Sequence, residues 1–270
     1  MEWDVLAHGY GLAEAPTIDT DGSLVFSDVL GGGVHRLDAS GAVTTIVPKR
    51  RGVGGIAIHA DGGVVCSGRD VIHVRAGSEP RTVLHVDGVS GWNDLCTDAG
   101  GRVYAGALRF AVFDPDAEAV PGELWRVGFD AGPDVVFGDV VHANGVVSTP
   151  DGGVVYMSDT LRQCVIVFDT QRRVRREIDV AALGHPDGMA LDESGALWVA
   201  LVRGGIVRLT PAGDIDLRLH PPSALTTSVC FDGHDLYVTT GGHSERPELR
   251  GCVLRTTVDA AGAPVAPARV

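Results

Sequence analysis

Four short segments of this chain each place an oxygen-bearing side chain just before an apolar run. Glu14 stands in LAEAPTID, Asn93 and Asp94 in GWNDLCTD, Asn144 in HANGVVSTPDG and Asp187 in HPDGMALDESG. Carboxylates and carboxamides are hard donors, which suit Ca²⁺, Mg²⁺ or Mn²⁺ better than a structural zinc. If these side chains converge, they could hold one divalent ion with positions left open for water and substrate.

Each segment also has a plainer interpretation. Asn and Asp often hydrogen-bond their own backbone and form turns, and Pro186-Asp187-Gly188 is a good turn sequence. Taken singly, turn formation accounts for each of these residues. The metal site is favoured only by a fold that brings the segments to one point in the same register.

A repeat that runs the length of the chain predicts such a fold. Each unit has an apolar strand, a Gly-containing turn, a second strand ending in small residues, a third strand and a polar fourth. The turns are Asp21-Gly22, Asp61-Gly62, Gly100-Gly101, Asp151-Gly152, Ser194-Gly195 and Asp232-Gly233. They recur about every forty residues, with one longer interval, as four-stranded propeller blades do. The sequence therefore predicts an all-β fold: one six-bladed β-propeller domain over residues 1–270, with a central metal channel.

The blade order places the four segments. The first strand of every blade lines the channel of a propeller, so residues that enter these strands converge on the axis. The segment around Trp3 to Leu6 is expected to supply the outer strand of the last blade and so remove an exposed sheet edge. The tail from Ala260 to Val270, rich in Ala and Pro, is expected to fray.

Composition restricts the partners. The net charge of −13 disfavours binding to a phosphate backbone, so we expect no nucleic-acid partner. No apolar stretch approaches the roughly eighteen residues that span a membrane, and the N-terminus lacks the pattern of a secretion signal. Five scattered cysteines without a C-x-x-C motif indicate free thiols. These features predict a cytoplasmic protein that acts on a small molecule; they leave its oligomeric state open.

Longer motifs resemble the gluconolactonase/regucalcin (senescence marker protein) family over nearly the whole chain. The most specific is the run PDGMALDESGALWVALVRGGIVRL at residues 186–209. The others are Glu14-Ala15-Pro16, Asn93-Asp94, Asn144-Gly145, Tyr156-x-x-Asp159, the run from Thr226 to Phe231 and the run from Leu236 to Thr239.

The resemblance implies a six-bladed propeller with a divalent ion in its channel. It assigns the protein ligands to Glu14, Asn144 and Asp187, and places Asn93 beside the ion, where it touches substrate or metal-bound water. It gives Asp187 a second role as general base, so that Asp187 and Asn93 are the expected catalytic residues. Calcium is the expected ion, with magnesium, manganese, zinc and iron as alternatives.

The substrate positions depart from the family pattern. Gly91 stands where sugar lactonases commonly carry an Arg, and Trp92 follows it. The loop after Leu108 contains Phe110 and Phe113. We expect Trp92 and both Phe residues to offer apolar surface near the entrance, and hence a preference for a less hydroxylated lactone or ester. The alternative is that the Phe residues only pack the loop onto the blade beneath.

Histidines add two candidates for substrate binding or proton transfer. His142 precedes Asn144 by two residues and His185 precedes Asp187 by two, so an extended segment points each pair the same way. Histidine titrates near neutral pH, although either ring could simply fill space at the channel mouth. His243 is a weaker candidate, on a loop expected at the same face.

The pattern predicts a metal-dependent hydrolase that opens a lactone or related ester, with the ion polarising the carbonyl and activating water. Neither a Gly-x-Ser-x-Gly elbow nor a phosphate-binding Gly-rich motif occurs in the sequence, which argues against a serine hydrolase or nucleotide enzyme. Two alternatives remain at this stage. One is a non-hydrolytic propeller enzyme of a biosynthetic pathway, and the other is a binding propeller in which the ion only stabilises the channel.

Overall fold

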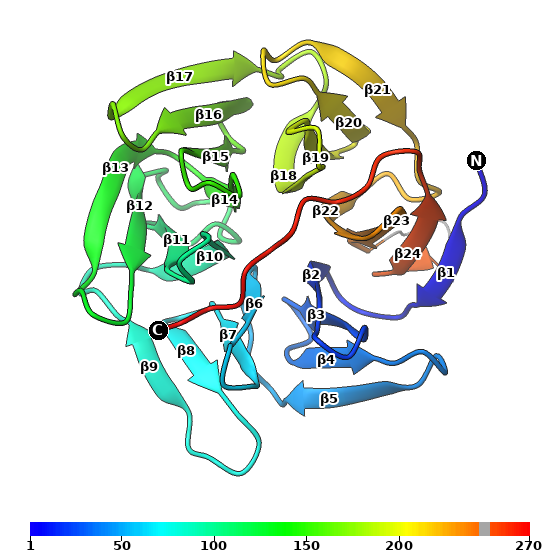
Figure 1. The fold of residues 1–270 in the computed structure, drawn as a ribbon, viewed down its shortest axis with the longest axis horizontal. Coiled ribbons are helices and arrows are strands. Elements are labelled where there is room, and N and C mark those ends of the chain that lie inside the picture. Colours follow the sequence, from blue (N-terminus) through cyan, green and yellow to red (C-terminus); the bar gives the residue numbers. More distant parts are fainter. Residues whose placement is uncertain (243–248) are drawn as a thin grey trace.

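The computed structural model describes residues 1–242 and 249–270 and forms six four-stranded antiparallel sheets around a central axis (Figure 1). Blades 1 to 3 consist of β2 (Ala13–Ile18), β3 (Leu24–Asp28), β4 (Val34–Leu37), β5 (Val43–Val47); β6 (Ile56–Ile58), β7 (Val64–Cys66), β8 (Val71–Val74), β9 (Arg81–Leu84); and β10 (Gly91–Thr97), β11 (Val103–Leu108), β12 (Gly122–Val127), β13 (Asp134–Val140). Blades 4 to 6 consist of β14 (Ala143–Ser148), β15 (Val154–Asp159), β16 (Cys164–Asp169), β17 (Val174–Asp179); β18 (His185–Leu191), β19 (Leu197–Val202), β20 (Gly205–Leu209), β21 (Ile215–Leu219); and β22 (Thr226–Asp232), β23 (Asp235–Thr240), β24 (Val253–Thr257), β1 (Asp4–Ala7). The predicted six-bladed propeller is confirmed.

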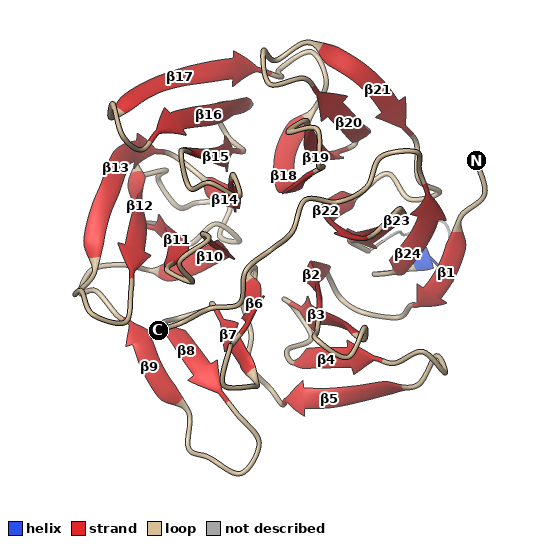
Figure 2. Ribbon diagram, in the orientation of Figure 1, coloured by secondary structure: helices blue, strands red, loops and turns tan. Residues whose placement is uncertain are grey.

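The turn between the first two strands of each blade explains the spacing of the repeat. The second glycine of the Gly100-Gly101 pair and the glycine of every other predicted turn have φ between +56° and +87°, a conformation that only glycine adopts without strain. Figure 2 shows these short turns joining strands throughout the ring. The turns that the sequence predicted are therefore confirmed, and each joins the first two strands of one blade.

The ring closes through its N-terminus. β1 pairs antiparallel with β24, with Asp4 opposite Arg255 and Val5 opposite Leu254. The two ends of the ring thus share one sheet, as predicted, and β24 does not present an unpaired edge.

Apolar side chains from neighbouring blades fill the space between them. One cluster joins Val65 and Val71 of blade 2 to Leu95 and Val103 of blade 3. Second strands such as β3 and β11 are buried along their whole length, because a blade covers each of their faces. No helix among the described residues has the length and apolarity to cross a membrane.

The C-terminal tail does not fray, contrary to the prediction. It runs across the centre of the face shown in Figure 1. Its backbone is hydrogen-bonded to the turns or the adjoining strand ends of four blades, at Gly262 N to Gly233 O (2.9 Å), Ala263 N to Leu191 O (2.9 Å), Ala268 N to Ile58 O (2.7 Å) and Arg269 N to Gly101 O (2.7 Å). Ala and Pro composition gave no sign of these partners, since they are backbone groups far away in the sequence.

Candidate functional site

The four inner strands that carry the predicted donors are irregular at those donors. The pairing register shifts between Glu14 and Thr17 in β2, Trp92 and Leu95 in β10, Ala143 and Val146 in β14, and Pro186 and Met189 in β18. A β-bulge bends its strand and redirects side chains, and bulges are common beside active sites. The irregularities therefore explain how residues of regular inner strands present polar side chains to the channel axis.

Glycines let the inner strands approach one another closely at this level. A Cβ on Gly145 of β14 would lie 2.2 Å from the Asp187 carbonyl oxygen of β18. A Cβ on Gly188 would lie 2.0 Å from Ser228 Oγ of β22. Neither position has room for a side chain, so Asn144-Gly145 and Asp187-Gly188 join a donor to the glycine that allows its blade to pack against the next.

Three carboxyl groups lie close enough to interact at this end of the channel. Burial raises the pKa of Glu14 well above its usual value, and the charges of Asp187 and Asp94 raise it further. Burial, followed by the charge of Asp94, also raises the pKa of Asp187. Burial raises the pKa of Asp94 to about 7, although hydrogen bonds from Leu95 N and Val146 N oppose that shift. The sequence pointed to Asn93 in blade 3, whereas the structure shows that Asp94 contributes the charge.

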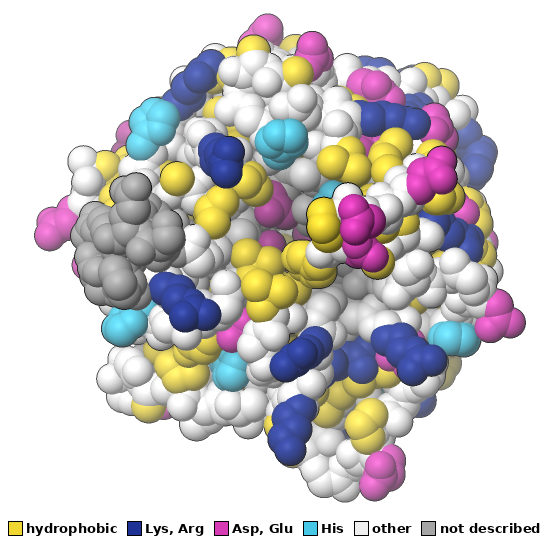
Figure 3. Space-filling model, turned by 180° about the vertical axis from the view of Figure 1, so that it is seen from behind, with side chains coloured by type: hydrophobic (Ala, Val, Ile, Leu, Met, Phe, Trp, Pro, Cys, Tyr) yellow, Lys and Arg dark blue, Asp and Glu magenta, His cyan; other side chains and the backbone are white. Residues whose placement is uncertain are grey.

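The opposite view of the molecule shows a hollow at the centre of this face with acidic side chains at its bottom (Figure 3). Glu14 and Asp187 are only 8% and 7% exposed. Asp187 Oδ1 is buried and has no hydrogen-bond partner among the described residues. An unpartnered carboxylate oxygen beside two other buried carboxyl groups is costly unless a cation is present.

The donor set fits a hard divalent cation. Carboxylates of Glu14 and Asp187 with the amide oxygen of Asn144 are ligands that calcium and magnesium prefer. The described residues hold no cluster of three or more His, Cys, Asp and Glu side chains with the spacing of a metal site. A site built from these three residues must therefore rely on the amide and on further ligands from solvent or substrate.

Two amides stand beside the carboxylates. Asn93 Nδ2 donates to the Ala143 carbonyl at 2.9 Å, which ties blade 3 to blade 4. Asn144 Nδ2 donates to Thr160 Oγ1 at 3.1 Å, and a hydrogen bond from Asn144 lowers the pKa of Asp187. The structure thus brings Asn144 and Asp187 into direct contact and holds Asn93 at the neighbouring blade interface.

Serines at the ends of second strands form hydrogen bonds with the backbone at the start of the inner strands, and the sequence analysis did not identify them. Ser158 Oγ donates to the Asp187 carbonyl at 2.7 Å. Ser67 Oγ accepts hydrogen bonds from Gly54 N (3.1 Å) and Gly55 N (2.9 Å). For blade 4 the signal was present in the sequence, because its second strand ends in Ser-Asp, as does that of blade 1, whereas Ser67 of blade 2 is followed by Gly68.

The aspartates that follow Ser158 and its counterpart in blade 1, Ser27, fix the loops that enter the inner strands. Asp159 accepts hydrogen bonds from Val141 N at 2.8 Å and His142 N at 3.1 Å. Asp28 does the same in blade 1, where Gly11 N donates at 3.0 Å. Each aspartate therefore positions the loop that leads to a donor, Asn144 or Glu14.

Trp92 is not at the entrance, and the expectation that it offers apolar surface there is wrong. Its side chain is 1% exposed, belongs to the core between blades 2 and 3, and meets Trp125 edge to face with centroids 6.3 Å apart. The bulge after Trp92 gives the physical reason. It turns the following Asn93 and Asp94 toward the channel and leaves the indole between the blades.

The remaining candidates separate into two groups. Phe110 is half-buried and its ring meets His142 edge to face, with centroids 6.2 Å apart; burial lowers the pKa of His142. His185 is exposed, with Nδ1 3.2 Å from the Thr160 carbonyl, and Phe113 is 65% exposed. His142 and Phe110 are therefore brought together, while His185 and Phe113 face solvent. His243 lies outside the described residues.

Gly91 leaves open space next to its own backbone. A Cβ at this position would have only one neighbour within 4 Å, the Gly68 carbonyl oxygen at 3.6 Å. Its backbone does not have the positive φ that requires glycine. The absence of a side chain at Gly91 is thus a local choice of sequence and not a requirement of the fold.

The sequence profile of the SMP-30/Gluconolactonase/LRE-like region matches residues 12–242. The chain is 32% identical to 6-deoxy-6-sulfogluconolactonase of Pseudomonas putida over 88% of each chain. It is 30% identical to pentonolactonase XacC of Haloferax volcanii, over 93% of this chain and 89% of the relative. The fold resembles that of a calcium-binding regucalcin of Agrobacterium tumefaciens with a TM-score of 0.84, 20% identity, and coverage of 98% of this chain and 96% of the other.

Proposed function

Since this chain belongs to the SMP-30/gluconolactonase/LRE-like family, we propose that it hydrolyses a lactone or a related ester with the help of one divalent ion. The observation that carries the proposal is the buried group of Glu14, Asp94 and Asp187 at one channel mouth, with Asp187 Oδ1 left without a partner. The names of the two relatives, a sulfogluconolactonase and a pentonolactonase, support a lactone as the substrate class.

Glu14, Asn144 and Asp187 are the residues proposed to hold the ion, and calcium is the ion that the donor set suits best. The name of the structural relative, a calcium-binding regucalcin, supports the same choice. When bound, the ion supplies positive charge that polarises the ester carbonyl and stabilises the oxyanion formed from it.

The side chains have separate tasks in this proposal. Asp187 accepts a proton from the attacking water as general base; its raised pKa in the cation-free site reflects a strong affinity for positive charge. Asn93, held on the Ala143 carbonyl through Nδ2, keeps Oδ1 for contacts with the substrate. Phe110 and His142 form the wall beside these groups and are proposed to contact the part of the substrate away from the reacting carbonyl.

The experiment is metal analysis of the purified protein combined with a panel of sugar lactones, alkyl lactones and aryl esters, assayed with and without chelator. We expect about one divalent ion per chain and hydrolysis that is lost with chelator and restored by added metal. Full hydrolysis after exhaustive removal of metal would refute the metal-dependent step. No hydrolysis of any panel member by the metal-loaded protein would refute the hydrolase.

A further inference from the structure

The channel has a second chamber behind the proposed metal centre, on the face that the C-terminal tail crosses. Its volume is about 660 Å³, within the range of pockets that hold small organic ligands. It lies between the rear halves of the inner strands and the tail residues Gly262–Pro267. Its inner end reaches Asp94, one of the three interacting carboxyl groups. The chamber is thus adjacent to the centre but opens to the opposite face.

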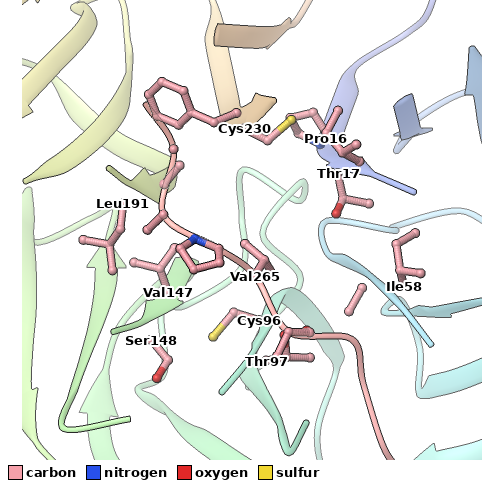
Figure 4. Close-up of a pocket in the computed structure, with 18 of the residues that line it drawn as sticks. Pro16, Thr17, Ile58, Cys96, Thr97, Val147, Ser148, Leu191, Cys230 and Val265 are labelled. Carbon is pink, nitrogen blue, oxygen red and sulfur yellow. The ribbon is translucent and has the colours of Figure 1, made fainter. Parts of the chain in front are cut away.

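Apolar groups and a few hydroxyls make up most of the wall. Figure 4 shows Val265 of the tail at the middle of the opening, surrounded by Val147 and Leu191 on one side and Thr17 and Ile58 on the other. Cys230 contributes its side chain from blade 6. A wall of this kind favours a ligand with an apolar body and at most one or two hydrogen-bonding groups.

The charge of the chamber wall also restricts which ligands can bind. Among the described residues that line the chamber, every charged side chain is an aspartate, and none is Lys, Arg or His. Two of these aspartates, Asp19 and Asp98, are paired with Arg36 and Arg102. Asp94 and Asp232 have no such ion pair among the described residues, so an anion would still meet negative charge and no cation in the lining. The carboxylate product of lactone hydrolysis is therefore disfavoured here, and a neutral molecule is favoured.

The tail crosses the opening of the chamber and is held by hydrogen bonds on both sides of it. Hydrogen bonds hold Gly262 and Ala263 on one side and Ala268 and Arg269 on the other. Between them, the Val265 side chain is 78% exposed, although it lies over an apolar chamber. A ligand in the chamber would cover this side chain and gain its burial.

We propose that this rear chamber is a second binding site, distinct from the metal centre, for a neutral and largely apolar small molecule. Val265 is the contact that the tail contributes. The wall formed by Val147, Leu191, Thr17 and Ile58 encloses the apolar body, and the aspartates at the rim exclude acids. The site does not depend on the proposed hydrolysis, because its residues are outside the proposed metal ligands.

A matched pair of fluorescent dyes tests the proposal. Phenylnaphthylamine is neutral, and anilinonaphthalene sulfonate carries the same rings with a sulfonate. We expect the metal-loaded protein to bind one neutral dye per chain, and to bind the sulfonate at least about tenfold more weakly because the wall holds no cation. Equal affinity for the two dyes, or no saturable binding of the neutral dye, would overturn the proposal.

Variants at Val265 locate the bound dye. Val265→Asp should weaken binding of the neutral dye at least about tenfold, and Val265→Leu should preserve it, because the first adds a charge and the second keeps an apolar contact. Val174→Asp is the matched control, since Val174 is also exposed (58%) but lies on the outer strand β17. Unchanged binding in Val265→Asp, or equal loss in Val174→Asp, would place the dye elsewhere and refute the site. Hydrolysis by all three variants should be unchanged, which separates this test from that of the proposed function.

Discussion

The two ends of the channel are built from the same inner strands but differ in chemistry. At one end, strand irregularities at Glu14, Asp94 and Asp187 bring three buried carboxyl groups together. At the other end, regular pairing resumes and the same strands present mainly apolar side chains to a chamber crossed by the tail. The carboxyl groups at the first end are buried and interact, whereas Asp232 at the second is exposed.

The difference shows where the strands accept an unfavourable arrangement. Buried carboxyl groups that repel one another destabilise a fold unless a ligand compensates, and Glu14, Asp94 and Asp187 stand where the backbone departs from regular pairing. The rear end avoids this conflict at its other described aspartates, because Asp19 and Asp98 are paired with Arg36 and Arg102 and Asp232 is exposed to solvent. We therefore expect changes at the first end to abolish chemistry and changes at the second to alter binding or stability by smaller amounts.

The largest contrast should come from removing one carboxylate at each end. We expect Asp187→Asn to lower kcat/KM for the best lactone by a factor of about 10³ or more, because it removes the charge of a proposed ligand and the general base together. Asp232→Asn at the rear end should change the rate by less than about twofold. Steady-state kinetics with metal analysis of both variants provide the measurement. Similar losses in the two variants would remove the functional distinction between the ends.

The effects of pH and of calcium on stability should also distinguish the two ends of the channel. In the cation-free protein, burial raises the pKa values of Glu14, Asp94 and Asp187 above those of the unfolded chain, and repulsion between carboxylates adds to the shifts of Glu14 and Asp187. These groups therefore contribute stability below about pH 4, and that contribution is lost as pH rises through about 7, where Asp94 titrates. Bound calcium favours the ionised forms, so its stabilising effect should grow with pH.

The expected result is a melting temperature that falls between about pH 5 and pH 8 without metal, and a calcium-induced increase at least about 5 °C larger at the higher pH. Thermal unfolding followed by circular dichroism measures both quantities. Asp187→Asn should reduce the calcium effect, whereas Asp232→Asn should not. An equal calcium effect at the two pH values would contradict the proposed coupling of the carboxyl groups to the ion.

A gain of function should be available at Gly91. Space is open there, so Gly91→Arg should fold and place a donor near the entrance. We expect the ratio of kcat/KM for a sugar lactone to that for an alkyl lactone to rise about tenfold, since a charged hydrogen bond to a substrate hydroxyl contributes about that much. Gly91→Met, which is unbranched like Arg and lacks the donor, is the control. The same shift in Gly91→Met would attribute the effect to packing.

The sequence predicted the blades because their signals are local. Each turn needs a glycine with positive φ, so Asp21-Gly22 and its counterparts revealed the repeat directly. The positions of Glu14, Asn144 and Asp187 at the starts of inner strands followed from that repeat. The repeat placed the donors at the right end of the channel without defining any distance between them.

The parts that could not be predicted depend on register and on distant partners. A one-residue irregularity reverses the side to which the following side chains point. This is why Trp92 lies in the core while Asp94 lies near the carboxyl groups of Glu14 and Asp187. The tail is ordered by backbone groups such as Gly101 O and Ile58 O. Neither feature leaves a signal in residue type, because a backbone acceptor has the same chemistry in every residue.

The smallest expected effect concerns the contact between the tail and a blade turn. Gly101 and Gly22 occupy equivalent turns with φ of +78° and +79°. A Cβ on Gly101 would lie 2.8 Å from Pro267 O and 2.9 Å from Arg269 Cβ, whereas a Cβ on Gly22 would have no neighbour within 4 Å. Gly22→Ala should therefore lower the free energy of unfolding by only about 1–2 kcal/mol, which is the cost of an L residue at positive φ. Gly101→Ala should lose about 1 kcal/mol more, because the tail must also shift. Urea unfolding of the two variants gives the difference. Equal losses would mean that the tail shifts at no cost in free energy. Its contacts over the rear chamber would then contribute little to the stability of the ring.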